Sequence, residues 1–192
     1  AVGGGSITPF LVQQLLNDLG DNPDQLPILQ HALMRTWDAW VKTGHTDEPI
    51  DVKDYENIGR LEKALSEHAN EAFNELDQTQ KEICQGIFKT LTERGGDNRG
   101  VRRPTPVSEI AEITSSTSAE IINIVDHFRV AGRSFLSPPM NISLTDDSVI
   151  DISHESLMRI WDKLIIWVNE EYEAVQIYKR LADSAEKFHL GE

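Results

Sequence analysis

Cysteine, basic residues and long apolar runs are all scarce in this sequence of 192 residues. Its single cysteine, Cys84, cannot form an internal disulfide, which favours a reducing compartment. No segment reaches the roughly 18 consecutive apolar residues of a membrane span, and the first residues do not resemble a signal peptide. We therefore expect a soluble, cytoplasmic protein without membrane contact.

The shortage of positive charge restricts the possible partners. Lysine and arginine number 18 against 32 aspartates and glutamates, which gives a formal net charge of −14. A surface this acidic repels phosphate backbones, so nucleic-acid binding is disfavoured unless the basic residues cluster. Hydrophobic residues, at 39%, are sufficient for buried cores, and Cys84 lies within an apolar helical stripe, so we predict that its thiol is buried.

The sequence motifs of independent catalysis are missing as well. The run Gly3-Gly4-Gly5-Ser6 lacks the lysine and the preceding strand of a phosphate-binding loop. His154-Glu155 is followed by Met158 at the position where a zinc-protease helix has its second histidine. No G-x-S-x-G motif occurs. We predict that the chain has no catalytic residues, no metal site and no enzymatic activity of its own.

The other histidines are dispersed along the chain. They are His31, His45, His68, His127 and His189. None has metal-ligand spacing relative to Cys84. His31 and His68 fall on predicted helices that should pack together, so a hydrogen-bonded position at the edge of a core explains them.

Helix signals dominate the first 76 residues. Thr8-Pro9 combines an N-cap hydroxyl with a proline at the first helical position, and Gly20 ends that helix. Further helices are predicted from about residue 26, over about 51–58, and along the apolar positions between 61 and 76. We interpret residues 1–76 as a helical domain. The opening AVGGGSITP has no initiator methionine and is typical of mid-chain sequence, so we expect a fragment of a longer protein.

The pattern changes after residue 76. Asp77 and Gln80 form a predicted capping box that opens a helix to about Glu93, before a glycine-rich loop over 95–100 and an extended stretch over 101–107. Two short helices follow, capped by Ser108 and by Thr117 or Ser118. Two strands are predicted at 134–137 and 149–152.

This order of helices and strands is typical of a winged helix-turn-helix domain, which we assign to residues 77–153. Ser153 is predicted to cap one long exit helix over 154–192. Its apolar stripe contains Leu157, Ile160, Trp161, Leu164 and Val168. The predicted fold class is therefore mainly α, with a small helical bundle, a winged helix with a short β-hairpin wing, and a long C-terminal helix.

A winged helix can read DNA through its third helix, here about residues 118–131. That helix offers Arg129 as its only arginine, beside Glu120 and Asp126. The basic residues that cluster in and after the glycine loop are Arg94, Arg99, Arg102 and Arg103. They can bind phosphate or pair with this chain's carboxylates, and the net charge favours pairing. A nucleic-acid-binding transcription regulator and a protein-interaction scaffold remain as alternative functions.

Three blocks together resemble the novel STAND NTPase family, signal-transduction ATPases related to the NB-ARC and apoptotic-ATPase group. The blocks are LPILQHALMRTW (26–37), DVKDYENIGRLEKALSEHANEAFNELDQTQKEI (51–83) and DISHESLMRIWDKLIIWV (151–168). They occur in the order that the family shows, and the resemblance covers nearly the whole chain.

The resemblance implies that an NTPase core with Walker motifs lies upstream and that this chain is the regulatory region after it. The full-length protein would be an ATPase that holds ADP or ATP with Mg, while the fragment holds no cofactor by itself. The implied partners are the P-loop NTPase domain of the same chain and downstream sensor or effector domains such as WD repeats.

The resemblance also implies two cofactor-binding residues. Pro27 matches a proline that packs near the adenine. His154 matches a histidine that contacts the β-phosphate of ADP and locks the closed, inactive state, although the Met-His-Asp triplet of the wider group is here Ser153-His154-Glu155. A histidine in the first turn of a helix is suitably placed for an anion. Purely structural roles at two helix starts are the alternatives for both residues.

Overall fold

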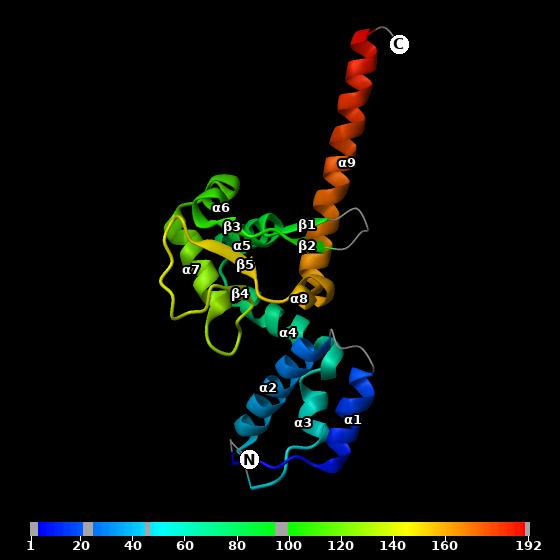
Figure 1. The fold of residues 1–192 in the computed structure, drawn as a ribbon, viewed down its shortest axis with the longest axis vertical. Coiled ribbons are helices and arrows are strands. Elements are labelled where there is room, and N and C mark those ends of the chain that lie inside the picture. Colours follow the sequence, from blue (N-terminus) through cyan, green and yellow to red (C-terminus); the bar gives the residue numbers. More distant parts are fainter. Residues whose placement is uncertain (1–3, 21–24, 45–46, 95–99, 191–192) are drawn as a thin grey trace.

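The computed structural model describes residues 4–20, 25–44, 47–94 and 100–190, and it is mainly helical (Figure 1). The helices are α1 (Pro9–Leu19), α2 (Leu26–Thr43), α3 (Val52–Asn57), α4 (Arg60–Asn74), α5 (Gln78–Thr90), α6 (Val107–Thr114), α7 (Ser118–Arg129), α8 (Glu155–Ile160) and α9 (Asp162–Leu190). The strands are β1 (Thr92–Arg94), β2 (Gly100–Arg102), β3 (Thr105–Pro106), β4 (Leu136–Ser137) and β5 (Val149–Ile152).

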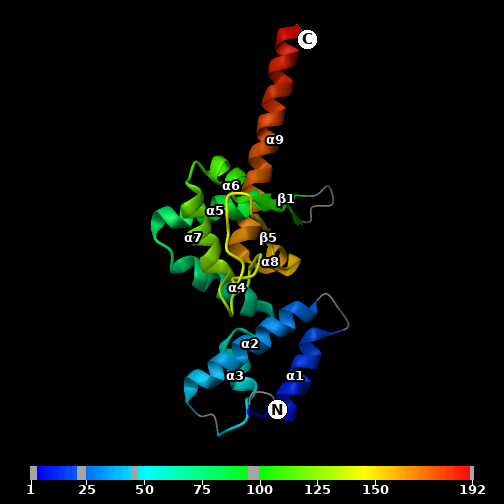
Figure 2. The same cartoon turned by 60° about the vertical axis from the view of Figure 1, so that its left-hand side comes forward.

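The helices α1 to α3 and the first part of α4 form a lower body, and α5 to α8 with the strands form an upper body from which α9 projects (Figures 1 and 2). None of the helices in the described ranges has the combination of length and apolar character that a bilayer crossing requires.

The predicted start of α1 is confirmed and has a tertiary role. The Thr8 hydroxyl accepts a hydrogen bond from the Leu11 amide at 3.2 Å, and Pro9 occupies the first turn. The same hydroxyl donates to the Asp51 carboxylate at 2.7 Å, at the N-cap of α3. Thr8 therefore ties the first turns of α1 and α3 together.

Helix α4 contributes to both hydrophobic cores. Leu61 and Ala64, in its first half, pack in the lower core with residues such as Tyr55. Its later apolar residues pack in the upper core: Leu65, Ala69 and Ala72. One unbroken helix thus joins the two bodies, and the predicted domain boundary at residue 76 stays a prediction.

Two small antiparallel sheets lie in the upper body. The predicted strands correspond to β4 and β5, which pair with Leu136 opposite Ile152, while β3 pairs with the other edge of β5 through Thr105 and Ile150. The hairpin β1–β2 was not predicted: the expected helix to Glu93 is wrong, because α5 ends at Thr90 and the chain turns into β1. Residues 95–99 of the predicted glycine loop lie outside the described residues, and Gly100 belongs to β2.

The predicted helix caps at Ser108 and Ser153 are wrong, because the backbone amides of both residues form hydrogen bonds with distant segments of the chain. Helix α6 begins at Val107 after Pro106, and the Ser108 amide donates to the Asp146 carbonyl at 2.9 Å. Ser153 stays with the strands, since its amide donates to the Phe135 carbonyl at 3.0 Å. His154 is the N-cap of α8, in extended conformation and without a side-chain capping bond.

The prediction of one continuous exit helix is also wrong, because the structure has two helices, α8 and α9, separated by a break at Trp161. The backbone of Trp161 leaves the helical region (φ −72°, ψ 105°) between α8 and α9. Leu157, Trp161 and Leu164 are nevertheless all buried in the same core. The apolar periodicity continues across the break, so the sequence pattern could not reveal it.

The upper core also contains Cys84, as predicted. Its side chain is fully buried, and burial raises the pKa of its thiol well above the usual value. The thiol is therefore a packing element of α5.

Candidate functional site

A cavity of about 250 Å³ lies where the lower and upper bodies meet. Pro27 from the first turn of α2 and His154 from the N-cap of α8 both line it, although 127 positions separate them in the sequence. Other lining residues come from α2 and from the loop between α7 and β4: Gln30, His31, Met34, Gly132, Arg133, Ser134 and Phe135. The structure thus places both predicted site residues on the wall of one cavity.

Local backbone chemistry positions the two predicted residues. Pro27 lies at the start of α2, where its missing N–H leaves no hydrogen bond unmade. His154 leaves β5 in extended conformation, and its carbonyl accepts from the Leu157 amide at 3.0 Å. Leu157 is buried and itself lines the cavity, so the backbone at His154 is held in place while the residue stays exposed.

Two histidines, on helices that the sequence predicted to pack together, support the cavity wall. His31 Nε2 lies 3.1 Å from His68 Nδ1, which joins α2 to α4. The ring of Phe135 packs against both, with centroid distances of 5.7 Å and 5.2 Å. Burial, then the charge of Arg35, lowers the pKa of His31 to about 4, and His154 contributes in the same direction. The same two leading causes lower the pKa of His68 to about 3.

These depressed pKa values predict a pH-dependent stability. In the unfolded chain His31 and His68 gain protons near pH 6.5, whereas in the folded protein they stay neutral down to about pH 4 and about pH 3. The free energy of unfolding should therefore fall as the pH drops below about 6.5, with a slope approaching one proton for each histidine.

Urea denaturation between pH 7 and pH 5 measures that slope. The double variant His31→Gln/His68→Gln should flatten it. Equal slopes for the native protein and the double variant would contradict a neutral buried pair.

The loop after α7 brings an arginine to the cavity that sequence analysis missed. Arg133 donates from Nη2 to both carboxylate oxygens of Glu75 at 2.6 Å and from Nη1 to the His127 carbonyl at 3.2 Å. Gly132, with φ at +89°, allows the turn that aims this side chain. The glycine after an amphipathic helix was the only sequence signal, because the partner Glu75 is 58 residues away.

The cavity lining is suited to part of an anionic ligand. None of its described lining residues is a carboxylate, whereas His154, Gln30 and Ser134 can donate hydrogen bonds. Its volume lies below the roughly 300–1,000 Å³ that usually encloses a whole small-molecule ligand. A nucleotide would therefore extend beyond this cavity, and the ligands of its Mg would have to come from elsewhere.

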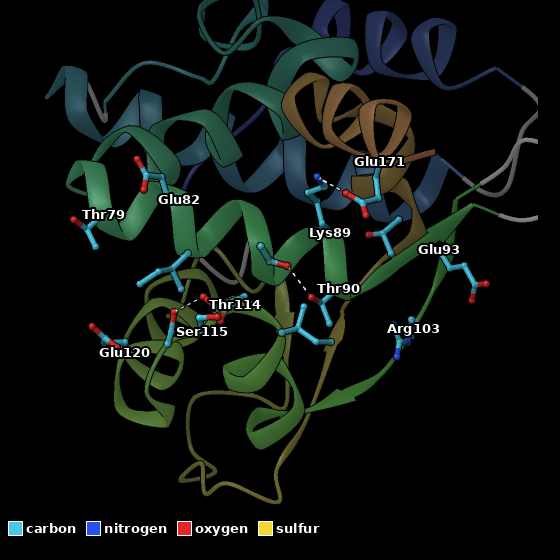
Figure 3. Close-up of a pocket in the computed structure, with 15 residues that line it drawn as sticks. Thr79, Glu82, Lys89, Thr90, Glu93, Arg103, Thr114, Ser115, Glu120 and Glu171 are labelled. Atoms are coloured by element: carbon cyan, nitrogen blue, oxygen red, sulfur yellow. Dashed lines mark hydrogen bonds and ion pairs between the residues drawn. The ribbon is translucent and has the colours of Figure 1, made fainter. Parts of the chain in front are cut away.

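A larger groove, of about 690 Å³, lies along α5 (Figure 3). It is on the side of α5 that faces away from the upper core. It is bordered by α5, β1, α9 and the α6–α7 corner, with Lys89 and Glu171 joined by an ion pair of 2.5 Å. Nothing in the sequence indicated it, because its wall is assembled from four separate segments. Within the described ranges, no cluster of three or more His, Cys, Asp or Glu side chains could hold a metal ion.

The arginines considered for nucleic-acid binding are engaged within the chain wherever they are described. Arg129 is buried on α7 and pairs with Asp126 at 2.6 Å. Arg102 pairs with Asp151 at 2.9 Å and Arg103 with Glu109 at 2.7 Å. The side chain of Arg94 and the whole of Arg99 lie outside the described residues. The prediction that these arginines pair with carboxylates of the same chain is therefore confirmed for Arg102 and Arg103.

Comparison with known proteins gives one family. The family model described as Novel STAND NTPase 1 matches residues 1–192. Neither the curated proteins nor the solved structures contain a significant match to this chain.

Proposed function

We propose, because the chain belongs to the novel STAND NTPase 1 family, that it is the regulatory region of a signal-transduction ATPase. In this proposal it closes over ADP or ATP held by a P-loop domain of the same protein. It then passes the nucleotide state to sensor or effector domains. The chain itself contributes no catalytic residue.

The winged-helix assignment is part of the proposal. Helices α5, α6 and α7 are followed by the paired strands β4 and β5, and β3 extends that sheet. This order supports a winged helix-turn-helix domain. Its third helix, α7, has its arginine buried, which argues against the DNA-reading use of such a domain.

The juxtaposition of Pro27 and His154 carries the nucleotide proposal. Both residues line the cavity between the two bodies, where no described lining residue is acidic. Pro27 would pack against the base, and His154 would donate a hydrogen bond to a phosphate oxygen. The bound nucleotide supplies the negative charge, while Leu157 and β5 hold the histidine backbone in place.

The position of His154 in the chain offers a route for the signal. It lies at the junction between β5 and α8, and α8 leads through Trp161 into the projecting helix α9 (Figure 1). A change in phosphate contact would alter how the upper body docks on the nucleotide domain, by rigid-body movement. Couplings of about 1–3 kcal/mol are typical of such switches.

The direct test is the variant His154→Ala in the full-length protein. Loss of a phosphate hydrogen bond worth about 1.4 kcal/mol should raise the ADP dissociation rate about ten-fold and increase basal activity. Release of a fluorescent ADP analogue after stopped-flow mixing with unlabelled ADP gives the rate.

Glu155→Gln provides the matched control. Glu155 is the next residue, is exposed, pairs with Arg159 at 3.0 Å and does not line the cavity, so its variant should release ADP at the native rate. Equal ADP release from His154→Ala and the native protein would remove the sensing role. Robust ATP turnover by residues 1–192 alone would contradict the regulatory assignment.

A further inference from the structure

The outer part of α9 presents an apolar face that the rest of the described chain leaves exposed. Leu164 and Trp167, in its first two turns, are buried in the upper core. Beyond them the helix extends away from the body in both views (Figures 1 and 2). Large apolar side chains continue there: Val175, Ile177, Tyr178 and Leu181.

The exposed face continues the face that packs against the body. Glu171 lies four residues after Trp167 and pairs with Lys89 of α5 at 2.5 Å. Val175 and Tyr178 follow Glu171 by four and seven residues, so they lie on the same side of the helix, one and two turns farther out. They are 40% and 74% exposed. The side of α9 directed at the body thus stays apolar after the body ends.

The groove of about 690 Å³ lies at the foot of this face, and Figure 3 shows Glu171 beside Lys89 on its wall. Glu171 belongs to both, because it lines the groove and begins the exposed face. Ile113 of α6 adds an exposed apolar side chain to the groove wall. Groove and helix face together form a continuous corner, which we call the α9 corner.

The α9 corner is acidic. Glu82, Glu93 and Glu120 line the groove, and none of them has a cationic partner in the described part of the chain. Lys89 is paired with Glu171 and Arg103 with Glu109, so the two cations at the groove are already neutralised. The surface therefore complements an apolar ligand whose edges carry positive charge.

We infer that the α9 corner docks an amphipathic helix of a partner protein, with an apolar stripe on Val175, Tyr178 and Leu181 and with lysine or arginine edges over the groove carboxylates. A helix-in-groove contact has this form, with anchors at i, i+3 or i+4, and i+7. A second copy of this chain is a poorer occupant, because its acidic groove and its net charge of −14 would repel those of the first copy. Anionic lipid would likewise be repelled by the groove.

The test uses a fluorescein-labelled peptide of about 20 residues, with leucine at i, i+3, i+4 and i+7 and lysines on both edges of that stripe. Fluorescence anisotropy with the 192-residue protein should show saturable binding. The double variant Tyr178→Ser/Leu181→Ser should weaken binding at least about ten-fold. Glu82→Lys/Glu93→Lys should weaken it similarly and reverse the preference toward a peptide with glutamate edges.

Phe10→Ser is the matched control, because Phe10 is an exposed aromatic residue on α1, in the lower body. It should leave binding unchanged, and circular dichroism should show native helix content in all variants, since the altered side chains lie outside both cores. The proposal is overturned by absence of binding, by equal binding of the glutamate-edged peptide, or by native affinity in the Tyr178→Ser/Leu181→Ser variant. Dimerisation in sedimentation velocity that depends on Tyr178 would assign the face to a second copy, and Tyr178-dependent binding to phosphatidylserine vesicles would assign it to a membrane.

Discussion

Replacing Trp161 by alanine is expected to lower the free energy of unfolding by about 3–5 kcal/mol. Trp161 is fully buried at the break between α8 and α9. Its ring packs edge-on against Phe88 and Trp167, with centroid distances of 4.8 Å and 5.3 Å. Its Nε1 donates to the Asn70 side-chain oxygen at 2.9 Å. The alanine variant would leave a large cavity where α4, α5 and α9 meet, together with an unsatisfied amide.

Urea denaturation followed by far-UV circular dichroism measures this loss. Trp161→Phe keeps most of the buried aromatic area but not the hydrogen bond, so its destabilisation should be clearly smaller. Tyr178→Ala, at an exposed position on the same helix, should stay within about 0.5 kcal/mol of the native protein. A loss below about 1 kcal/mol for Trp161→Ala would contradict the stabilising role assigned to its packing and its hydrogen bond.

The second large effect is expected at Arg129. Its side chain is 2% exposed, Nε donates to Asp126 at 2.6 Å, and Nη1 donates to three carbonyls of the loop between β4 and β5. These are the carbonyls of Pro138, Pro139 and Ile142, at 3.0, 2.8 and 2.8 Å. Arg129→Ala would leave the loop carbonyls and a carboxylate without their donor, which should cost about 3–5 kcal/mol.

Chemical denaturation together with amide hydrogen exchange distinguishes the local from the global part of this effect. Faster exchange should appear first at the Ile142 amide, which donates to the Pro139 carbonyl at 3.0 Å within the held loop. Arg102→Ala is the control, because its partly exposed pair with Asp151 should be worth less than about 1 kcal/mol. Native stability in Arg129→Ala would mean that the loop is held by other contacts.

The burial of Arg129 also bears on function. It was the only arginine on the helix that would have entered a DNA groove, and the structure uses it to hold a loop of its own domain. The family match is to the Novel STAND NTPase 1 family, and the cavity shared by Pro27 and His154 supports the proposal of a nucleotide-dependent regulatory region. An acidic exterior suits protein partners better than nucleic acid.

The sequence alone determined the features whose causes lie within a few residues of each other. The caps at Thr8, Asp77 and Thr117 each bind an amide three residues ahead, so the residue types at that spacing were sufficient to predict them. The mainly helical class followed from apolar periodicity, and the family followed from three ordered blocks. The buried thiol followed from its position on an apolar helix face, and hydrogen-bonded core-edge positions for His31 and His68 followed from helices expected to pack together.

The tertiary structure decided what depends on partners far along the chain. The short strands β1 and β2 have too few residues to show a period, and the break at Trp161 leaves the apolar pattern unchanged. Arg133 reaches the cavity wall because its guanidinium is bound by Glu75. Ser153 does not cap a helix, because its amide donates to the Phe135 carbonyl and keeps the residue beside the strands. The sequence named Pro27 and His154 only through resemblance, and their common cavity exists because α4 belongs to both cores and fixes one body against the other.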